Sequence, residues 1–207
     1  MTATTAEMAY HYHVALADDS QALSYLRGRG ISELAIASHR LGVVDGAYPE
    51  HAEYRGRITV PYTSKLGGVH GFKFRYIGES DAESKYKSSH MPTRIYNPMA
   101  FEAAEKLGYI GISEGEFDAV ILTTECGIPT VGVPGVDTWA KHKEWRLLFD
   151  GFESVLIFRD QDEPGLKLAQ RIMSDVNNAR VVNLPGKDPN ETFLKHGREA
   201  IRHAAGL

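Results

Sequence analysis

Residues 107–113 (LGYIGIS) and 154–158 (SVLIF) are short apolar segments that run into acidic residues, Glu114 and Asp160. Further strand-like and helix-like segments alternate with them along the second half of the chain: 129–133 and 180–184, and 117–126, 138–149 and 165–177. Strands that alternate with helices of about ten or more residues are typical of a parallel sheet with helices on its faces. The second half is therefore predicted to be an α/β domain with four parallel strands.

The first half of the chain has a different pattern. Helix-like segments at 20–29 and 32–41 precede two alternating, β-rich segments at 57–61 and 69–76. Residues 65–68 (KLGG) between these two segments favour a hairpin turn. This half is predicted to be a small α+β unit with a basic hairpin.

These patterns divide the chain into two domains with short ends. We expect a basic α+β subdomain over residues 14–100 and an α/β domain over 101–197. Residues 1–13 and 198–207 are expected to be terminal segments, of which the first is poorly ordered because it lacks a clear apolar period.

The composition limits the class of protein. The chain has 207 residues, a net charge of −4 and a single cysteine, Cys126, which can form neither an internal disulfide nor a multi-cysteine zinc site. Its start lacks the basic and apolar parts of a secretory signal, and no apolar run reaches the roughly 18 residues that span a bilayer. We therefore expect a cytoplasmic protein without a membrane partner and without a zinc site.

The small net charge hides two blocks of opposite charge. Residues 55–94 contain eight basic and three acidic residues, a net charge of +5, and residues 101–163 contain five basic and thirteen acidic residues, a net charge of −8. Adjacent blocks of this kind can bind a polyanion with one block and cations with the other. Two ordinary solvated faces would give the same pattern, so charge alone leaves both interpretations open.

Acidic side chains follow two of the predicted strands. Glu114 comes directly after the first, and Asp160 and Asp162 follow the third with the two-residue spacing that places side chains on one side of an extended segment. Asp188, after the fourth strand, adds a further carboxylate to the same edge of the sheet. Clustered carboxylates of this kind favour Mg²⁺ or Mn²⁺, whereas acidic residues in turns also serve as helix caps.

A competing motif overlaps this site. Residues 111–115 (GISEG) match G-x-S-x-G, the nucleophile elbow of α/β-hydrolases, and Asp160 and His196 follow Ser113 in the required order. The chain lacks the glycine-rich oxyanion loop of that class, and the hydrolase interpretation leaves the basic hairpin unexplained. Ser113 is therefore the weaker candidate.

Three segments together resemble the Toprim part of DnaG-type DNA primases, particularly the shorter phage-encoded forms. They are 112–120 (ISEGEFDAV), 155–165 (VLIFRDQDEPG) and 184–191 (LPGKDPNE). Upstream segments resemble the preceding basic subdomain of the same family. They are 57–61 (RITVP), 68–75 (GVHGFKFR) and Lys85-Tyr86, and the whole resemblance covers roughly residues 20–197. The Toprim motifs are shared with topoisomerases, RecR-like proteins and some nucleases, and the upstream block is the more primase-specific element.

The resemblance implies roles for individual residues. The implied catalytic residues are Glu114, Asp160, Asp162 and Asp118, and the implied metal ligands are Glu114, Asp160, Asp162 and Asp188. The implied nucleic-acid and nucleotide contacts are Arg57, Lys73, Arg75, Lys85 and Lys87. The chain departs from the family pattern at Glu163-Pro164, where Arg-Ala is usual, and at Asn190, which replaces a second downstream acid.

The resemblance also implies a function. A primase core uses Mg²⁺ or Mn²⁺ to synthesise short RNA primers from ribonucleoside triphosphates on a single-stranded DNA template. A separate zinc-binding primase subunit and a replicative helicase are the further partners it implies. A Toprim nuclease with the same metal site and a non-catalytic nucleic-acid-binding accessory protein remain alternatives, and a topoisomerase is disfavoured because the chain has no room for a tyrosine-bearing domain.

Overall fold

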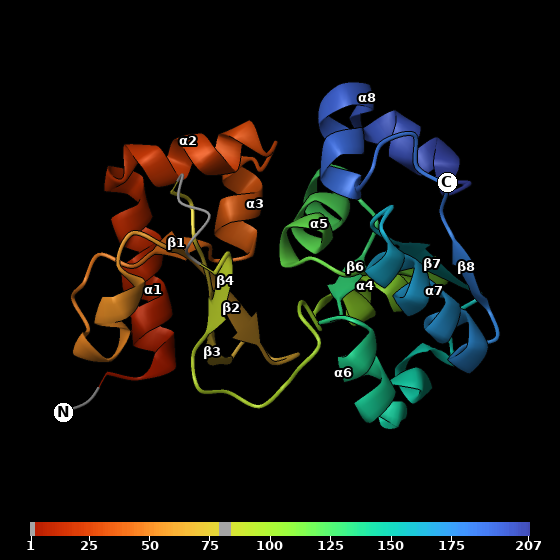
Figure 1. Ribbon diagram of the computed structural model, residues 1–207, viewed down its shortest axis with the longest axis horizontal. Helices are drawn as coiled ribbons and strands as arrows, with labels where there is room; N and C mark the ends of the chain where they lie inside the picture. The colour runs from red at the N-terminus through yellow and green to blue at the C-terminus, as the bar shows by residue number, and fades with distance from the viewer. Residues whose placement is uncertain (1–2, 79–83) are drawn as a thin grey trace. The chain divides into compact units, whose positions relative to one another are not determined.

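The computed structural model describes residues 3–78 and 84–207. The chain divides into two compact units, Met1–Pro92 and Thr93–Leu207. The division precedes helix α4 (Ala100–Leu107), which belongs whole to the second unit, whereas a boundary after residue 100 would cut through this helix. Both units are drawn in Figure 1.

The first unit is built on an antiparallel sheet in the order β1-β2-β3-β4. Its strands are β1 (Gly42–Val43), β2 (Ile58–Thr63), β3 (Val69–Arg75) and β4 (Tyr86–Ser88). The predicted hairpin is confirmed, since β2 and β3 pair and Gly67 takes a positive φ of 80° in the turn. Strand β4 was not predicted from the sequence; its Tyr86 pairs with Arg75 of β3.

The helices of the first unit follow the predicted pattern only in part. The α-helices are α1 (Thr5–Ala15), α2 (Ser20–Gly28) and α3 (Glu33–Ser38), and the 3-10 turns are η1 (Leu16–Asp18) and η2 (Pro49–Tyr54). Helix α2 matches its prediction. Helix α3 begins after its N-cap, Ser32, the first residue of the predicted segment, but ends at Ser38, three residues before Leu41.

Helix α1 corrects the expected disorder of residues 4–13, whereas residues 1–2 of that segment lie outside the described residues. Thr4 and Glu7 form a capping box at its start, and Met8, Ala9 and Tyr12 are buried. They pack with Phe72 and Phe74 of β3, in a cluster that closes one face of the sheet. The prediction failed because the apolar residues of α1 are interrupted by histidine and tyrosine rather than spaced as a regular stripe.

The second unit contains the predicted parallel sheet, in the order β6-β5-β7-β8. The strands are β5 (Tyr109–Ser113), β6 (Thr130–Gly132), β7 (Ser154–Phe158) and β8 (Ala179–Val181). All three pairings are parallel. The predicted fold class of this half is therefore confirmed.

Helices and tight turns alternate with these strands. After α4 they are α5 (Glu116–Val120), the π-helical turn η3 (Ile121–Glu125), α6 (Val136–Lys141), the 3-10 turn η4 (Lys143–Phe149), α7 (Glu163–Asp175) and α8 (Pro189–Ala204). The segment 138–149 was predicted as one helix, but it changes from α to 3-10 geometry at His142.

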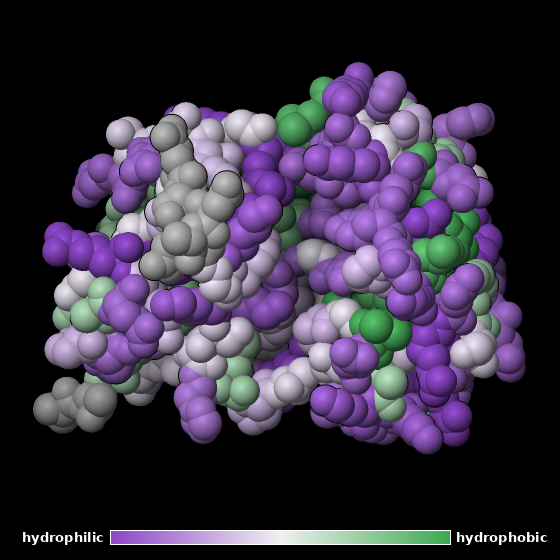
Figure 2. Space-filling view, in the orientation of Figure 1, coloured by the Kyte–Doolittle hydropathy of each residue, from purple (hydrophilic) through white to green (hydrophobic). Residues whose placement is uncertain are grey.

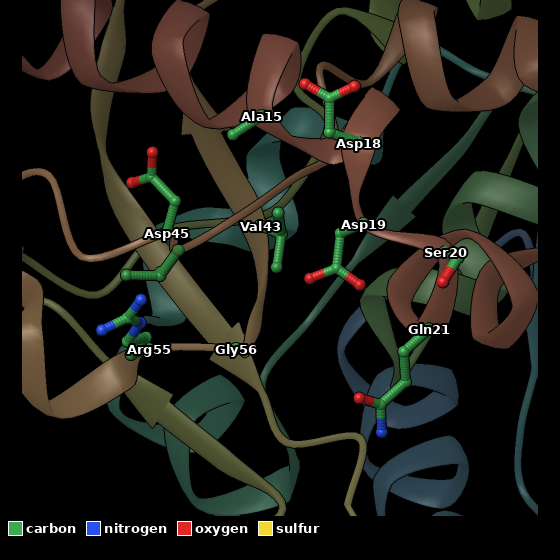
Figure 3. A pocket seen from close by; sticks show the side chains of 10 residues that line it. Ala15, Asp18, Asp19, Ser20, Gln21, Val43, Asp45, Arg55 and Gly56 are labelled. Carbon is green, nitrogen blue, oxygen red and sulfur yellow. The ribbon is translucent and has the colours of Figure 1, made fainter.

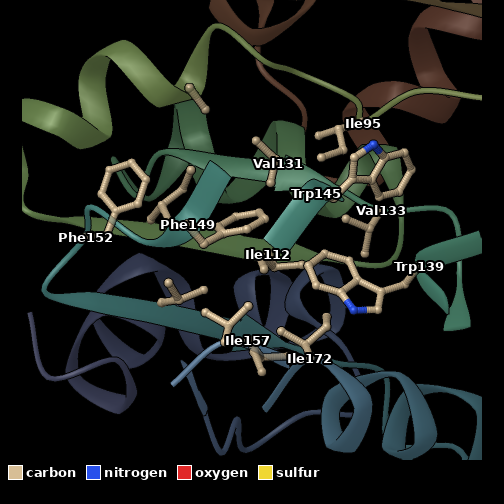
Figure 4. Close-up of a cluster of buried hydrophobic side chains, with 14 of the residues drawn as sticks. Ile95, Ile112, Val131, Val133, Trp139, Trp145, Phe149, Phe152, Ile157 and Ile172 are labelled. Atoms are coloured by element: carbon tan, nitrogen blue, oxygen red, sulfur yellow. The ribbon is translucent and has the colours of Figure 1, made fainter. Parts of the chain in front are cut away.

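Aromatic and branched side chains fill the core of the second unit (Figure 4). Trp139, Trp145 and Phe149 from α6 and η4 lie against Ile112 and Ile157 of the two central strands. Helix α7 covers the sheet with Ile172, while apolar side chains also gather on the surface around it in Figure 2.

Residues 198–204, expected to belong to a terminal segment, continue helix α8. Gly197 has a positive φ of 76° and kinks the helix, which then continues through residues 198–204. Ile201 and Ala205 are fully buried, and Arg202 Nη1 donates to the carbonyl oxygen of Cys126 at 3.1 Å. In the part of the chain that the structure describes, no helix has the length and apolar character needed to cross a membrane.

Candidate active site

The sheet of the second unit brings the predicted carboxylates to one edge. Ser113, the last residue of β5, is in register with Phe158, the last residue of β7. Glu114 and the loop that contains Asp160 therefore leave neighbouring parallel strands at the same, carboxyl, end. This is the edge at which parallel sheets bind their ligands.

The carboxylates are close enough to affect one another. Burial raises the pKa of Glu114, and the negative charges of Asp160 and Asp162 raise it further. Burial also raises the pKa of Asp160, with added contributions from Asp188 and Asp162, while Lys187 acts in the opposite direction. Each of these two acids is thus harder to ionise in the folded chain, first because it is partly buried and second because like charges lie near it.

One carboxylate oxygen of Glu114 is buried without a hydrogen bond. This atom, Oε2, has no hydrogen-bond partner among the residues that the structure describes. A buried carboxylate oxygen without a partner is costly, because it has lost water and gained nothing in return. Within residues 3–78 and 84–207, however, no three side chains of histidine, cysteine, aspartate or glutamate form a group that could hold a metal ion.

Two of the predicted metal ligands, Asp162 and Asp188, each use one carboxylate oxygen to cap a helix. Asp162 Oδ1 accepts a hydrogen bond from the backbone N–H of Gly165 at 2.8 Å at the start of α7. Asp188 Oδ1 accepts one from the N–H of Glu191 at 2.6 Å at the start of α8. One carboxylate oxygen of each residue is therefore engaged, and the helix-cap interpretation applies to both.

Gln161, which the sequence analysis missed, ties the two acidic loops together. Its Nε2 donates to the carbonyl oxygens of Leu184 and Gly186 at 3.1 and 2.8 Å. The loop after β8 also needs Gly186, because a Cβ atom there would lie 2.7 Å from Thr192 Oγ1. No local sequence signal identifies a glutamine that binds carbonyl groups more than 20 residues away.

The side chain of Asp118 contacts the backbone of two other residues, Asn190 and Gly115. Its Oδ1 accepts a hydrogen bond from the N–H of Asn190 at 3.3 Å, and its Oδ2 lies so near Gly115 that a Cβ there would be 2.5 Å away. Asp118 therefore joins α5 to the start of α8. Its contacts suit a positioning residue better than the predicted catalytic one.

The nucleophile-elbow interpretation is wrong. Ser113 is 1% exposed, and its Oγ donates to the carbonyl oxygen of Gly115 at 3.1 Å. A nucleophile at an elbow must present its oxygen to substrate, whereas this hydroxyl is buried at the last residue of strand β5.

The predicted basic residues do not form one surface. Arg57 is only 3% exposed; its Nη1 donates to the carbonyl oxygen of Ser84 at 2.9 Å, and its guanidinium lies over the Tyr76 ring. The contacts of Arg57 are therefore within the fold of the first unit. Lys85 is exposed, and Lys87 lies 3.5 Å from Glu53.

Lys73 and Arg75 do share a face of the first unit's sheet, since they are two residues apart on β3. The Tyr86 ring of β4 lies beside both, 5.8 Å from Lys73 Nζ and 4.7 Å from Arg75 Cζ. Lys87, the next residue along β4, projects to the opposite face, near the Tyr54 ring.

The first unit also has a cavity of about 510 Å³ that contains none of the predicted site residues (Figure 3). Asp18, Asp19, Asp45 and Arg55 line it. Asp19 caps α2, and Asp45 accepts hydrogen bonds from the His11 ring and the backbone of Ala47, so these acids have local structural roles.

Comparisons with known proteins cover the part of the chain that contains this site. The model of the Toprim-like family matches residues 111–193, which span the whole acidic edge. The Gene 57 protein of Mycobacterium phage D29 is 36% identical over 157 residues, covering 72% of this chain and 97% of the relative. The DNA primase of Thermotoga maritima is 26% identical and covers 90% of this chain. The chain belongs to the Toprim-containing family of DnaG-type primases.

Solved structures of primases share the fold. The Escherichia coli primase catalytic core superposes with a TM-score of 0.72 at 25% identity, covering 95% of this chain and 76% of that one. The zinc-binding and RNA polymerase domains of the Aquifex aeolicus primase give 0.79 at 22% identity, covering 99% and 62%. The predicted family and fold, a Toprim domain within a core of the primase type, are confirmed.

The length of the match differs among the relatives. This chain spans nearly all of the phage relative but only 40% of the Thermotoga maritima primase and 31% of the DNA helicase/primase of Enterobacteria phage T3. The longer primases therefore contain parts that have no counterpart in this chain.

Proposed function

We propose that this chain is a primase catalytic core that synthesises short RNA primers from ribonucleoside triphosphates on single-stranded DNA. The observation that supports it most strongly is the buried Oε2 of Glu114 near Asp160, which has no hydrogen-bond partner among the described residues, in a chain of the primase family. The relatives include a DnaG catalytic domain solved with single-stranded DNA. The bacterial host's cytoplasm is the compartment in which such an activity would serve phage replication.

The carboxylate oxygens at this edge have the chemistry of divalent-cation ligands, although no three of the described side chains already form a group that could hold such a cation. Glu114 and Asp160 would hold it, with the remaining oxygens of Asp162 and Asp188, because hard carboxylate oxygens suit Mg²⁺ or Mn²⁺. When bound, such an ion supplies positive charge to the triphosphate and makes a hydroxyl easier to deprotonate. The same charge would relieve the repulsion that raises the pKa of Glu114 and Asp160.

The chain's own residues would prepare the site for this chemistry. Gln161 fixes the distance between the loop of Asp160 and the loop of Asp188. Asp118 holds the start of α8 through Asn190, and so fixes the backbone next to Asp188. Fixed ligands lose little freedom when substrate binds, which favours positioning of the reacting groups.

The basic face of the first unit would bind the polyanion. Lys73 and Arg75 are placed on one strand face with Tyr86, and Lys85 is exposed directly before Tyr86. Cations beside aromatic rings suit single-stranded nucleic acid, whose phosphates and bases both find partners. Lys87 would contribute from the opposite face, and Arg57 would act through the fold.

Two proteins are proposed as partners. A separate zinc-binding primase subunit is suggested by the Aquifex aeolicus structure, which joins zinc-binding and RNA polymerase domains in one chain. A replicative helicase is suggested by the helicase/primase of phage T3, which joins both activities. Neither is required for the test of the catalytic core.

The test is synthesis of labelled RNA on single-stranded DNA with Mg²⁺ or Mn²⁺. We expect product from the wild-type chain, none from Asp160→Asn, and full product from Asp150→Asn, an exposed aspartate outside the site. Activity in Asp160→Asn would contradict the assigned site. Cleavage of labelled DNA without ribonucleotides, together with no RNA product, would instead identify a Toprim nuclease.

A further inference from the structure

The hydroxyl of Tyr25 lies between two arginines that are distant in sequence. Its Oη accepts a hydrogen bond from Arg29 Nε at 2.9 Å and another from Arg75 Nε at 3.0 Å. Tyr25 and Arg29 belong to α2 and its C-cap, whereas Arg75 ends β3. One phenol oxygen thus orients two guanidinium groups from two elements.

The contact leaves a defined part of each guanidinium group for a further acceptor. A hydroxyl oxygen has two lone pairs, and the two Nε–H donors use both. A phenol is neutral, so the contact holds two positive groups together without supplying a negative charge to either. With Nε engaged, a planar guanidinium meets any further acceptor through its terminal Nη groups, the fork that matches phosphate oxygens.

The guanidinium groups of Arg29 and Arg75 also lie close to the Tyr25 ring itself. Arg29 Cζ lies 5.4 Å from the centre of the Tyr25 ring and Arg75 Cζ lies 5.9 Å from it. The cations and rings form a continuous cation–tyrosine row across the face: Tyr62, Lys73, Tyr86, Arg75, Tyr25 and Arg29. Cation–aromatic contacts of this kind limit the positions of the cations, and rows of cations and aromatic rings suit single-stranded nucleic acid.

We propose that Tyr25 is a positioning residue for phosphate binding, which holds Arg29 and Arg75 so that their guanidinium groups bind one phosphate. The phosphate belongs either to the single-stranded DNA chain or to a ribonucleoside triphosphate, which present the same oxygens. The inference rests on the proposed function, because it requires the first unit to bind one of these two ligands. A structural role alone would have Tyr25 join α2 to β3 and nothing more.

Tyr25→Phe separates the two roles, since it removes the acceptor and keeps the ring. Tyr10→Phe is the matched control, because Tyr10 is 72% exposed on α1. Affinity is measured with fluorescent single-stranded DNA across several salt concentrations and, separately, with ATP and Mg²⁺. We expect Tyr25→Phe to weaken binding of one ligand about three- to tenfold. For DNA, the slope of log affinity against log salt should fall by about 0.7, the loss of one phosphate contact.

Arg75→Lys is the second variant, because it keeps the charge but loses the Nε donor. It should weaken binding in the wild-type background and add little in the Tyr25→Phe background, since both changes break the same contact. The ligand whose affinity falls, either single-stranded DNA or ATP, identifies the source of the phosphate.

The outcomes that contradict the inference are distinct. If the wild-type chain binds DNA and ATP and Tyr25→Phe changes neither affinity nor salt slope, the inference is overturned and the proposed function stands. A weaker but equally salt-dependent complex, with a lower melting temperature and additive effects of the two variants, would assign Tyr25 a structural role. If the wild-type chain binds neither ligand, the nucleic-acid role of the first unit fails and the inference fails with it.

Discussion

The backbone N–H of Gln161 donates a hydrogen bond to the carbonyl oxygen of Lys187 at 2.8 Å. This contact, with the two bonds from the Gln161 side chain, joins the loop after β7 to the loop after β8. Asp160 precedes Gln161 in one loop and Asp188 follows Lys187 in the other. An uncharged side chain between the acidic residues therefore sets how far apart their carboxylates are.

Gln161→Ala should loosen this arrangement. It removes two side-chain hydrogen bonds, so we expect the free energy of unfolding to fall by roughly 1–2 kcal/mol. Because it frees the loops that hold the proposed ligands, affinity for Mn²⁺ should fall about tenfold, as measured by titration calorimetry. Gln170→Ala, on the exposed side of α7, is the control and should change neither quantity. Unchanged Mn²⁺ affinity in Gln161→Ala would show that the tie does not support a metal site.

The pKa of Glu114, raised above its ordinary value of 4.5, predicts a stability gain in Glu114→Gln. An acid with a raised pKa in the folded state binds its proton more tightly folded than unfolded. Its contribution to stability therefore falls as pH rises through the window above about 4.5, where the ionised form is repelled by Asp160 and Asp162. At neutral pH and without metal, Glu114→Gln should melt about 1–3 °C higher than wild type, an increase limited by solvent screening.

Two conditions should change the difference between Glu114→Gln and wild type. The first is low pH: below about pH 4.5 the difference in melting temperature should vanish, since the wild-type carboxyl is then protonated in both the folded and the unfolded state. The second is added metal. Added Mg²⁺ at neutral pH should raise the melting temperature of wild type and not that of Glu114→Gln, because binding to the folded state alone stabilises it. An equal Mg²⁺ response in the two proteins would remove Glu114 from the metal site.

Ser113→Ala should keep primer synthesis. The change removes a buried hydrogen bond to the carbonyl of Gly115, so a loss of about 1 kcal/mol in stability is expected. RNA synthesis at a temperature well below melting should stay within about twofold of wild type, and wild type should fail to react with a fluorophosphonate probe. Labelling of Ser113 would reinstate the hydrolase interpretation.

The parallel sheet was predictable because β5 and β7 are continuous apolar segments flanked by turns and acids. The position of Glu114 and Asp160 then follows from parallel topology alone. Other features depend on contacts between distant residues, which a single sequence does not show. Gln161 binds the carbonyl groups of a loop more than 20 residues away, and Arg57, expected at the surface from its charge, is buried beside Tyr76.

Helix α1 was missed although its start has a local signature. Thr4 and Glu7 have the spacing of a capping box, but the helix that they begin has no regular apolar stripe. Its stability comes instead from Tyr12, which packs on Phe72 and bonds the His51 ring at 2.9 Å. Periodicity is a good indicator of helices that bury one stripe and a poor one for helices that bury a few large side chains.

Thr4→Ala tests whether the cap of α1 contributes to the fold of the first unit. The threonine Oγ1 accepts from the N–H of Glu7 at 3.3 Å, and removing this acceptor should cost about 1 kcal/mol in urea unfolding. Thr4→Ser keeps the acceptor and should stay near wild type. If both variants matched wild type, α1 would be a frayed end, as its sequence first indicated.

Gly165→Ala is predicted to damage both the fold and the site, although alanine normally favours a helix. In most helices this change stabilises by about 0.5–1 kcal/mol. At Gly165 a Cβ atom would lie 2.4 Å from the backbone oxygen of Asp160 and 3.1 Å from Asp162 Oδ1, so the loop of both acids must move. We expect a loss of about 1–3 kcal/mol in stability and a large loss of RNA synthesis below the melting temperature.

Gly151→Ala is the control for this prediction, because a Cβ there meets nothing within 4 Å among the residues that the structure describes. Its stability should stay within about 0.5 kcal/mol of wild type and its activity should be unchanged. A Gly165→Ala protein that is as stable and as active as Gly151→Ala would contradict the close approach of α7 to Asp160. A Gly165→Ala protein that is folded at the assay temperature but inactive would show that the site depends on the position of Asp160, because the substitution changes no carboxylate.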